Sequence, residues 1–413
     1  MNERQVNINE KIKVLFIESA QGFGGSIISL SESLKGMHNI EPIVLVLQDL
    51  EALDKLYYPF RLIKRKLLLN YLVKYQYTGF LERHIGISFL NRILILPFLL
   101  LSYIEHKLYI SFVSNLIKKE DIQLVYSNNG YNDCAVISAK ECNIPCTLHF
   151  RGYKQTPYSY DNINNRYPSK FFAISECVKS YLLKSDVPEK YIYTVHNSVD
   201  SARFTEANKN RDKLRDTLLP SANMLAIGIF GRVAEWKGQE DFIKAIKILS
   251  NNTQTKFKAF IVGDGSDSDA AYYENLKYCY ETDVSNGLLE FCGYISDVEE
   301  YYSAMDIVVH ASIRPEPFGR VVIEGMAARS ALIAMNEGGP AEVITNGIDG
   351  LLVEPRSLEK LVEALIAVCE SNDLRVKLSE NGLKTVRTKY TPEYVGGEIE
   401  KQLLQVIDNF SKE

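Results

Sequence analysis

Two glutamates in the stretch RPEPFGRVVIEGMA (residues 314–327), Glu316 and Glu324, stand eight positions apart. The prolines on both sides of Glu316 disfavour a helix through it. We therefore expect a helix to begin at Phe318 or Gly319 and to carry Glu324 more than a turn inside. Two helical carboxylates at this spacing would lie about 12 Å apart along the axis, whereas a retaining glycosidase needs about 5 Å. The spacing favours two separate roles on one hydroxyl-rich ligand; a helix cap and a buried ion pair are the alternative.

Two cations follow a strand-like run in the stretch IFGRVAEWKGQ, where Gly231 lets the backbone turn before Arg232 and Lys237. Two positive groups at the carboxyl end of a strand suit a diphosphate, because together they neutralise a dianionic leaving group. The alternative is a solvated helix start without a ligand.

Two glycine-rich turns are candidate anion sites. The first, GFGGS, places Gly22, Gly24 and Gly25 before an expected helix, where backbone N–H groups favour an anion. It matches neither the dinucleotide nor the Walker fingerprint, and a purely structural turn is an equal alternative. The second turn, Gly338 and Gly339, is another candidate donor of N–H groups or a plain strand-to-helix turn.

His149 ends a predicted strand in TLHFRG. Strand ends favour binding or catalytic side chains, yet a lone histidine is more often structural, so both interpretations stay open. His and Cys never cluster at ligand spacing, so zinc ligation is not expected. The seven cysteines form no C-x-x-C pair. Reduced thiols in a cytosolic protein are therefore expected.

The elements that must position these residues are short, nearly continuous apolar runs alternating with helical patterns, which is typical of parallel α/β sheets. The N-terminal runs are KVLFIES, EPIVLVLQD, IQLVYSNN, PCTLHFRG and KFFAIS. After a polar stretch at residues 200–223, which suits a domain boundary, MLAIGIFGR, FKAFIVGDG, LEFCGYI, DIVVHAS and SALIAMNEGG follow. We predict two doubly wound α/β domains with the ligand at the carboxyl ends of their strands.

Residues 55–120 break this rhythm. Between residues 61 and 120 ten basic residues face three acidic ones, within a chain of 413 residues whose net charge is −5. Amphipathic helices on an anionic membrane and a helical insertion with a solvated basic face are both compatible. The apolar run 93–104 is too short to span a bilayer, and the polar first residues lack the apolar core that a signal peptide would have. The net charge argues against a general nucleic-acid binder.

Taken in order, GRVAEWKG, VGDGSD, FCGYISDVEEYYSAMDIVVHAS, EPFGRVVIEGMA and NEGGPAEVITNGIDGLLVEP resemble glycosyltransferase family four, also called glycosyl transferases group one. The N-terminal half adds GFGGSIISLSESL, VYSNN, TLHFRG and AISECVKSYLLKSDVPEKYIYTVHNSVDSARF. The resemblance covers nearly the whole chain and is weakest from residue 50 to 120. The departures are Ser198, Gly325, Ser330 and Leu332, none of which removes a charged group from the inferred site.

The resemblance implies a GT-B fold, with two Rossmann-like domains facing each other across a cleft. It assigns residues 1–205 to the acceptor, residues 206–390 to the nucleotide sugar, and residues 391–413 to a helix packing back on the first domain. It further implies a retaining transferase that uses a UDP- or GDP-sugar, with no cofactor or metal. Arg232 and Lys237 would hold the diphosphate.

The remaining roles implied by the resemblance are distributed along the donor. Glu324 would bind the ribose and Glu316 the transferred sugar, with His149 near that sugar. The other residues implied to line the nucleotide-sugar site are Gly24, Gly25, Gly231, Tyr294, Phe318, Gly319 and Arg320.

The family's usual roles suggest synthesis of a surface polysaccharide or glycolipid from a glycan or lipid-linked acceptor. The expected location is the cytoplasm, with possible peripheral contact between residues 55–120 and the inner membrane face. Two alternatives stay open: a non-catalytic nucleotide-sugar-binding protein and a GT-B epimerase or hydrolase.

Overall fold

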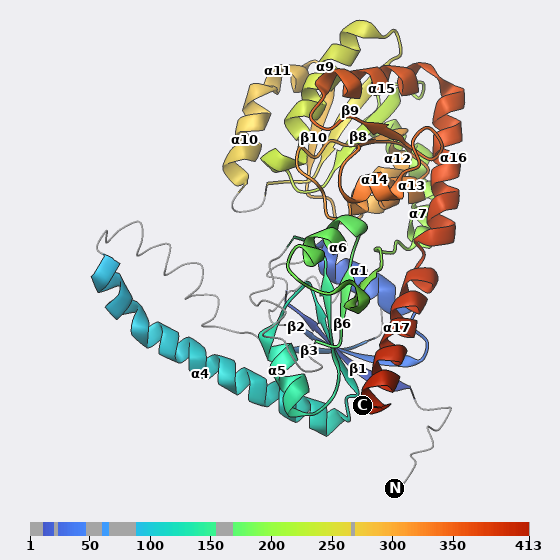
Figure 1. The fold of residues 1–413 in the computed structure, drawn as a ribbon. Helices are drawn as coiled ribbons and strands as arrows, with labels where there is room; N and C mark the ends of the chain where they lie inside the picture. Colours follow the sequence, from blue (N-terminus) through green and yellow to red (C-terminus); the bar gives the residue numbers. More distant parts are fainter. Residues whose placement is uncertain are drawn as a thin grey trace. The chain divides into compact units, whose positions relative to one another are not determined.

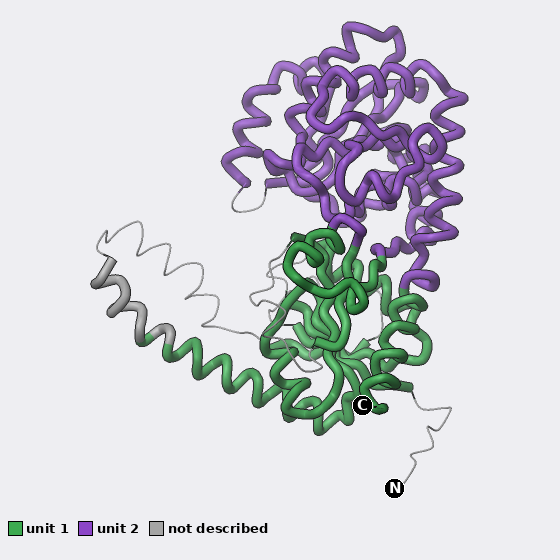
Figure 2. Tube along the Cα trace, in the orientation of Figure 1, with its two compact units in different colours: residues 1–174, 178–195, 396–413 green, residues 175–177, 196–395 purple. Residues whose placement is uncertain are grey.

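A computed structural model describes residues 11–19, 24–46, 60–65, 88–153, 168–265 and 269–412. The chain divides into two compact units (Figure 2). Unit 1 comprises residues 1–174, 178–195 and 396–413, and unit 2 comprises residues 175–177 and 196–395. Each unit is an α/β body built around a parallel sheet (Figure 1).

The described part of unit 1 contains a seven-stranded parallel sheet in the order β3-β2-β1-β4-β5-β6-β7. Its strands are β1 (Ile12–Glu18), β2 (Ile40–Val46), β3 (Arg61–Lys64), β4 (Leu124–Asn128), β5 (Cys146–Phe150), β6 (Lys170–Ala173) and β7 (Ile192–Thr194). The central strands are buried along nearly their whole length, which explains their continuous apolar sequences.

The helices of unit 1 connect and cover these strands. They are α1 (Gly25–Lys35), α4 (Ser88–Glu120), α5 (Asp133–Glu141), α6 (Glu176–Leu183), the 3₁₀ turn η4 (Glu189–Tyr191) and most of α17 (Pro392–Lys412). The first residues of α6 are counted with unit 2, and α17 joins unit 1 from Gly396 onward.

From Gly396 onward, helix α17 packs within unit 1. Gly396 lies so close to α1 that an added Cβ would come within 2.2 Å of the Ser33 carbonyl oxygen. Further along, the backbone N–H of Asn39 donates to Glu400 at 2.5 Å. A glycine and a carboxylate therefore fix this helix against unit 1.

The segment 55–120 differs from the expected all-helical insertion. Residues 61–64 form β3, which pairs in parallel with β2. Sheet pairing at an open edge outweighs the local pattern there, because β2 offers unpaired backbone groups to any adjacent extended segment. Residues 55–59 and 66–87 lie outside the described residues. Among the residues that the structure describes, no helix has the length and apolar character needed to cross a membrane.

The described part of unit 2 contains a six-stranded parallel sheet in the order β10-β9-β8-β11-β12-β13. Its strands are β8 (Leu225–Phe230), β9 (Phe257–Val262), β10 (Leu289–Gly293), β11 (Ile307–His310), β12 (Ala331–Met335) and β13 (Leu351–Val353). The five strands predicted from the second series of apolar runs are all confirmed. The short strands β7 and β13 were not predicted.

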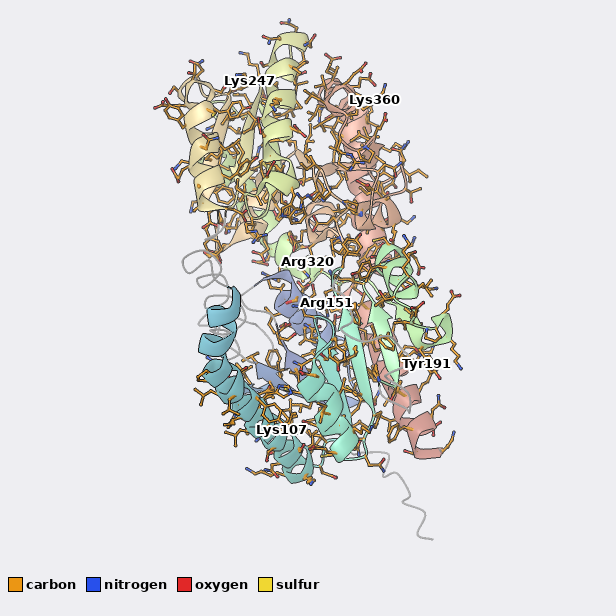
Figure 3. All side chains as sticks on the ribbon, turned by 60° about the vertical axis from the view of Figure 1, so that its left-hand side comes forward. Lys107, Arg151, Tyr191, Lys247, Arg320 and Lys360 are labelled. Carbon is orange, nitrogen blue, oxygen red and sulfur yellow. The ribbon has the colours of Figure 1, made fainter. Side chains whose placement is uncertain are left out.

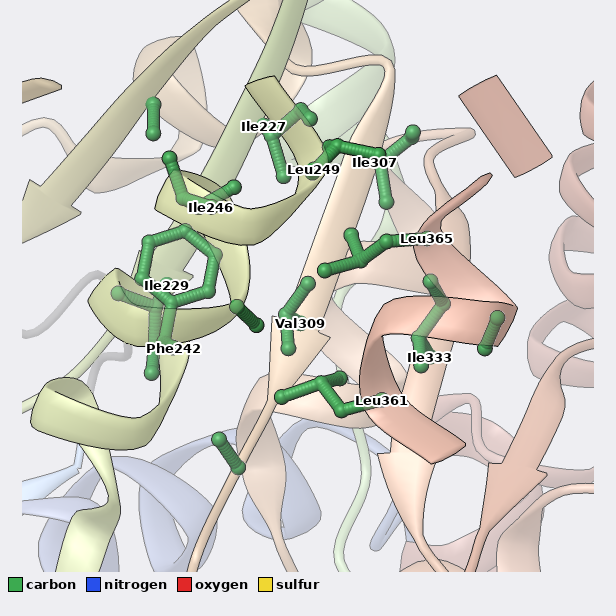
Figure 4. Packing of buried hydrophobic residues seen from close by; sticks show 14 of the residues in the cluster. Ile227, Ile229, Phe242, Ile246, Leu249, Ile307, Val309, Ile333, Leu361 and Leu365 are labelled. Carbon is green, nitrogen blue, oxygen red and sulfur yellow. The ribbon is translucent and has the colours of Figure 1, made fainter. Parts of the chain in front are cut away.

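Helices surround this second sheet. They are α7 (Ser201–Ala207), η5 (Asn208–Asn210), α8 (Arg211–Leu218), η6 (Glu235–Lys237), α9 (Gln239–Asn252), α10 (Ala270–Cys279), α11 (Glu281–Ser285), α12 (Val298–Ala304), α13 (Arg320–Ala327), α14 (Gly339–Val343), α15 (Leu358–Glu370) and α16 (Asn372–Lys389). Figure 4 shows the core on one face of the sheet, where Ile229 and Val309 of the strands pack near Phe242 of α9 and Leu365 of α15.

The boundary between the units lies at 195/196 rather than at the predicted 205/206. The polar stretch 200–223, expected to lie at a domain boundary, instead contains α7 and α8 of unit 2. Its charges are used within unit 2, because Arg211 and Arg215 both bind the carboxylate of Asp306 at 2.7 and 2.8 Å. A polar composition therefore indicated surface helices here and not a linker.

Candidate active site

The strand order of unit 2 reverses between β8 and β11. In open α/β sheets, ligands bind outside the carboxyl ends of the strands at such a switch point. Gly231, Arg232 and Lys237 follow β8, and Glu316 follows β11. The sheet topology therefore brings the predicted cations and one predicted carboxylate together at the carboxyl ends of β8 and β11.

Lys237 and Glu316 form an ion pair at this switch point. The Lys237 Nζ atom lies 2.7 Å from Glu316 Oε2, and both side chains are largely buried. Ser312 Oγ donates to the same oxygen at 3.2 Å, and His310 Nε2 lies 3.6 Å from it. Burial by itself would raise the pKa of the Glu316 carboxyl, but the Lys237 charge and the His310 contact outweigh it and lower the pKa to about 2. Glu316 is therefore ionised at neutral pH.

His310 and Ser312 were not among the predicted site residues. They stand in the HAS sequence at the end of β11, whose last residue is His310. A polar pair at the carboxyl end of a buried strand was the signal that could have revealed them. His310 is almost fully buried beneath the pair.

The loops after β8 and β11 are locked together by backbone contacts. The N–H of Ile313 donates to the carbonyl of Trp236 at 2.9 Å. Gly238 adopts φ +73°, and a Cβ there would meet the Ala311 carbonyl oxygen at 1.9 Å. This close approach requires glycine, and it holds Lys237 next to the loop that carries Glu316.

The second glycine-rich turn completes the same arrangement. Gly339 N–H donates to the Glu316 carbonyl at 2.8 Å. A Cβ on Gly338 would come within 2.4 Å of that oxygen, and a Cβ on Gly339 within 2.3 Å of Phe318 Cα. The turn after β12 is thus packed directly on the Glu316 loop, and its glycines are required by this packing. Whether it also offers N–H groups to a phosphate stays a prediction.

Helix α13 begins at Arg320 with Gly319 at its N-cap in the left-handed conformation, φ +82°. This confirms that Glu316 precedes the helix and that Glu324 lies more than a turn inside it. Arg320 Nη2 binds Glu324 Oε1 at 2.8 Å, and the Tyr302 hydroxyl donates to Oε2 at 3.1 Å. The two glutamates therefore have separate partners and do not form a carboxylate pair. Tyr302, which the sequence did not single out, stacks on Phe230 at 3.7 Å between centroids.

Three other predicted site residues of unit 2 differ in their exposure: Arg232, Tyr294 and Phe318. Arg232 is about half exposed and lies 3.4 Å from Asp269. Tyr294 follows β10, two strands away from β8, and is 69% exposed. The Phe318 ring is buried beside His196 and Tyr390, so that only its backbone is a candidate to line a ligand site.

Three predicted residues belong to unit 1. Gly24 is the N-cap of α1, and Gly25 is its first residue; Gly22 lies outside the described residues. His149, at the end of β5, is fully buried, and the Tyr126 hydroxyl contacts its Nδ1. Burial, followed by the nearby Arg151 charge, lowers the pKa of His149 well below its ordinary value. His149 is therefore neutral at physiological pH.

Further polar residues lie at the carboxyl ends of β1, β4 and β5, next to the switch point of unit 1. The Asn128 amide donates to the buried carboxylate of Glu18 and accepts from Arg151 Nε at 2.6 Å. Sequence reasoning missed this chain of residues, although each member stands at a predicted strand end.

One group of potential metal ligands occurs among the described residues, and it lies in unit 1. It consists of His106 on α4 with Asp133 and Cys134 at the start of α5. His106 Nε2 lies 3.3 Å from Asp133, and its Nδ1 lies 3.4 Å from the Cys134 sulfur. Both ring nitrogens are thus engaged within the protein.

Comparison with solved structures defines the class of fold. The crystal structure of Anabaena Alr3699/HepE in complex with UDP superposes with a TM-score of 0.71 at 20% identity, over 95% of this chain and 100% of its own. The two Rossmann-like parallel-sheet units are those of the GT-B fold.

Residues 210–385, which lie within unit 2, match the family described as Glycosyl transferases group 1. A lipopolysaccharide core mannosyltransferase, LpcC of Rhizobium leguminosarum, is 30% identical over 48% of this chain and 55% of its own. An Escherichia coli UDP-Gal:alpha-D-GlcNAc-diphosphoundecaprenol alpha-1,3-galactosyltransferase is 25% identical over 64% of this chain and 71% of its own. The chain spans little more than half the length of the first curated relatives that it matches, at 54%, 55% and 59%.

Proposed function

We propose that this protein is a retaining glycosyltransferase that moves a sugar from a nucleoside diphosphate sugar to a glycan or lipid-linked acceptor. The product would be a surface polysaccharide or glycolipid. The observation that carries the proposal is the Lys237–Glu316 pair, 2.7 Å apart at the switch point of unit 2. It supplies a cation for the departing diphosphate and an ionised acceptor for sugar hydroxyls.

The proposed chemistry follows from these charges. Lys237 has three N–H donors, of which one reaches Glu316. The others, together with Arg232, can neutralise the diphosphate as its bond to the sugar breaks. The acceptor hydroxyl attacks the anomeric carbon of the sugar on the face from which the diphosphate departs. Its proton passes to the leaving phosphate oxygen. This scheme requires positioning and charge stabilisation more than a protein base.

Glu324 is the proposed ribose anchor. Its carboxylate is held from both sides by Arg320 and Tyr302, which sets its direction while leaving lone pairs for ribose hydroxyls. Hydrogen bonds to an ionised acceptor are stronger than those to a neutral one. We expect Glu324 to contribute to donor affinity.

The relatives indicate which substrates to test first. The Escherichia coli relative is named for UDP-galactose and for an acceptor carried on diphosphoundecaprenol. The Rhizobium relative is named as a mannosyltransferase of lipopolysaccharide core synthesis. These names support a UDP-sugar donor and a cell-envelope glycan or lipid-linked acceptor, and a GDP-sugar is the second donor class to test. All seven cysteines are free thiols, which supports a reducing cytoplasmic setting.

The decisive experiment separates binding, hydrolysis and transfer. A panel of UDP- and GDP-sugars is screened by thermal shift, since a true donor stabilises the protein by mass action. Release of the nucleoside diphosphate is then measured with and without polyprenyl-diphosphate-linked N-acetylglucosamine, in buffer containing EDTA. Acceptor-dependent release that persists in EDTA supports a metal-independent transferase, and the anomeric coupling in the proton NMR spectrum of the product tests retention.

Other outcomes favour the two alternatives. Tight donor binding with no turnover under any condition indicates a nucleotide-sugar-binding protein. Donor turnover that needs no acceptor indicates a GT-B epimerase or hydrolase.

A further inference from the structure

Helix α4 has two opposite faces, and among the residues that the structure describes only one of them packs against the rest of unit 1. Tyr109, Ile110, Val113, Leu116 and Ile117 are buried. Their spacing of three and four residues forms one stripe along the helix. The C-terminal half of α4 lies beside α5 (Figure 1), where Ser138 donates to the Ile110 carbonyl at 3.2 Å. This contact fixes which side of the helix points outward.

The opposite face exposes large aliphatic side chains. Leu100, Leu101, Ile104 and Leu108 are 60%, 46%, 45% and 60% exposed, and Tyr103 beside them is 59% exposed. The four aliphatic residues also follow a spacing of three and four, so they form a continuous stripe. A helix on the surface of a globular protein normally carries polar residues there, and a contiguous apolar patch marks an interaction site.

Lysines lie along the same exposed side. With about 100° of rotation per residue, Lys107, Lys118 and Lys119 stand within about 60° of Ile104. All three are exposed, and Figure 3 labels Lys107 on α4. The acidic neighbours stand apart from this stripe: Glu105 lies about 100° from Ile104, and Glu120 binds Arg61 at 2.5 Å. The face is therefore both apolar and cationic.

We propose that this face of α4, from Leu100 to Lys119, binds an anionic lipid surface. Aliphatic side chains that enter the headgroup boundary, flanked by lysines that meet anionic headgroups, are the two requirements for a helix lying on a membrane. A second copy of the chain fits less well, because two such faces would bring six lysines together. The proposal goes beyond the transfer reaction, and its test needs neither donor nor acceptor.

Two other basic residues of the segment 55–120, Arg61 and Arg65, are engaged within unit 1. Arg61 is paired with Glu120, and the Arg65 guanidinium lies over the Phe112 ring at 4.1 Å. Neutralising these arginines would disturb contacts within unit 1, so they are poor probes of the surface. The α4 lysines offer a cleaner test.

The first experiment measures cosedimentation of the full chain with vesicles of phosphatidylcholine alone or mixed with phosphatidylglycerol. The triple variant Leu100→Ser, Ile104→Ser and Leu108→Ser removes the apolar stripe. Its control removes three exposed aliphatic side chains of unit 2: Ile248→Ser, Val284→Ser and Val376→Ser. We expect the α4 variant to bind the anionic vesicles at least about tenfold more weakly and the control to bind like wild type.

The second experiment tests charge. Lys107→Gln, Lys118→Gln and Lys119→Gln are compared with Lys209→Gln, Lys277→Gln and Lys360→Gln, three exposed lysines of unit 2 with the same change in net charge. The α4 set is expected to lose about tenfold or more in affinity, and salt should weaken wild-type binding in the same way.

Three outcomes would overturn the proposal. Wild type could fail to bind anionic vesicles at low salt. The α4 and control variants could bind equally. The serine variant could dissociate a dimer or lower the melting temperature without vesicles, which would mean that protein covers this face. A protein that is active as a transferase but does not bind vesicles would refute the proposed lipid-binding face and leave the proposed function intact.

Discussion

The Nζ atom of Lys237 lies 2.7 Å from Oε2 of Glu316, although the two residues are 79 positions apart in the chain. The pair joins the loop after β8 to the loop after β11, at the point where the strand order of unit 2 reverses. Both side chains are largely buried. Each charge is therefore stabilised mainly by the opposite charge of its partner and not by water.

Replacing Lys237 by alanine should reduce turnover by about a hundredfold, roughly 3 kcal/mol on the barrier, through lost charge stabilisation. It also leaves Glu316 without its main partner, so the melting temperature should fall. Steady-state kinetics and thermal unfolding measure the two effects separately. Lys244→Ala is the control, since Lys244 pairs with Glu240 on an exposed helix face at 2.8 Å. Near-normal turnover in Lys237→Ala would refute the assigned role.

The stability of the protein should depend on the ionisation of Glu316 in acid. Its pKa is lowered to about 2 in the folded state, so the ion pair stabilises the fold above the unfolded-state pKa of about 4.3. This contribution, about 3 kcal/mol, is lost as the pH falls from about 5 to 2. Urea unfolding of wild type and Glu316→Gln at pH 7 and pH 3 measures it. The two proteins should differ in their pH dependence, and equal dependence would contradict the depressed pKa.

Gly339→Ala should destabilise the protein by more than about 1 kcal/mol and impair donor binding, because its Cβ would meet Phe318 Cα at 2.3 Å. Gly397→Ala is the matched control, because nothing lies within 4 Å of an added Cβ in that helical position. Alanine there should be neutral or stabilising by up to about 1 kcal/mol. Chemical denaturation of both variants tests the contrast, and similar effects at both positions would refute the packing argument.

Tyr302→Phe should raise the KM for the donor about fivefold with little change in kcat. It removes the hydroxyl that donates to Glu324 at 3.1 Å, and such a bond contributes about 1 kcal/mol. Comparing UDP with its 2′- and 3′-deoxy analogues by calorimetry isolates the ribose contact. If the variant loses affinity for all analogues equally, Tyr302 supports only the fold. Preserved stacking on Phe230 should keep the melting temperature close to that of wild type.

Local features of the sequence were sufficient for much of the framework. Apolar runs predicted ten of the strands, because burial on both faces of a parallel sheet leaves a pattern in consecutive residues. Two prolines predicted a helix start at Phe318 or Gly319, within two residues of the observed start at Arg320, because they restrict backbone angles within a few residues. This alone separated Glu316 from Glu324.

Tertiary structure decided what local patterns do not encode. The polar residues at 200–223 predicted a domain boundary. In the structure, Arg211 and Arg215 of this stretch form ion pairs with Asp306 inside unit 2. Likewise, the sequence placed His149 at the end of a strand. That its side chain is fully buried follows from the packing of residues far apart in the chain.

The site itself shows the same division. The sequence shows the types of the site residues and predicts that they lie at strand ends, because a strand end is determined by residues that are close together in the chain. Strand order then determined that Lys237 meets Glu316, with His310 beneath them, and that Tyr302 meets Glu324. Strand order is set by the burial of whole faces against one another, which is a property of the entire unit and not of any short stretch.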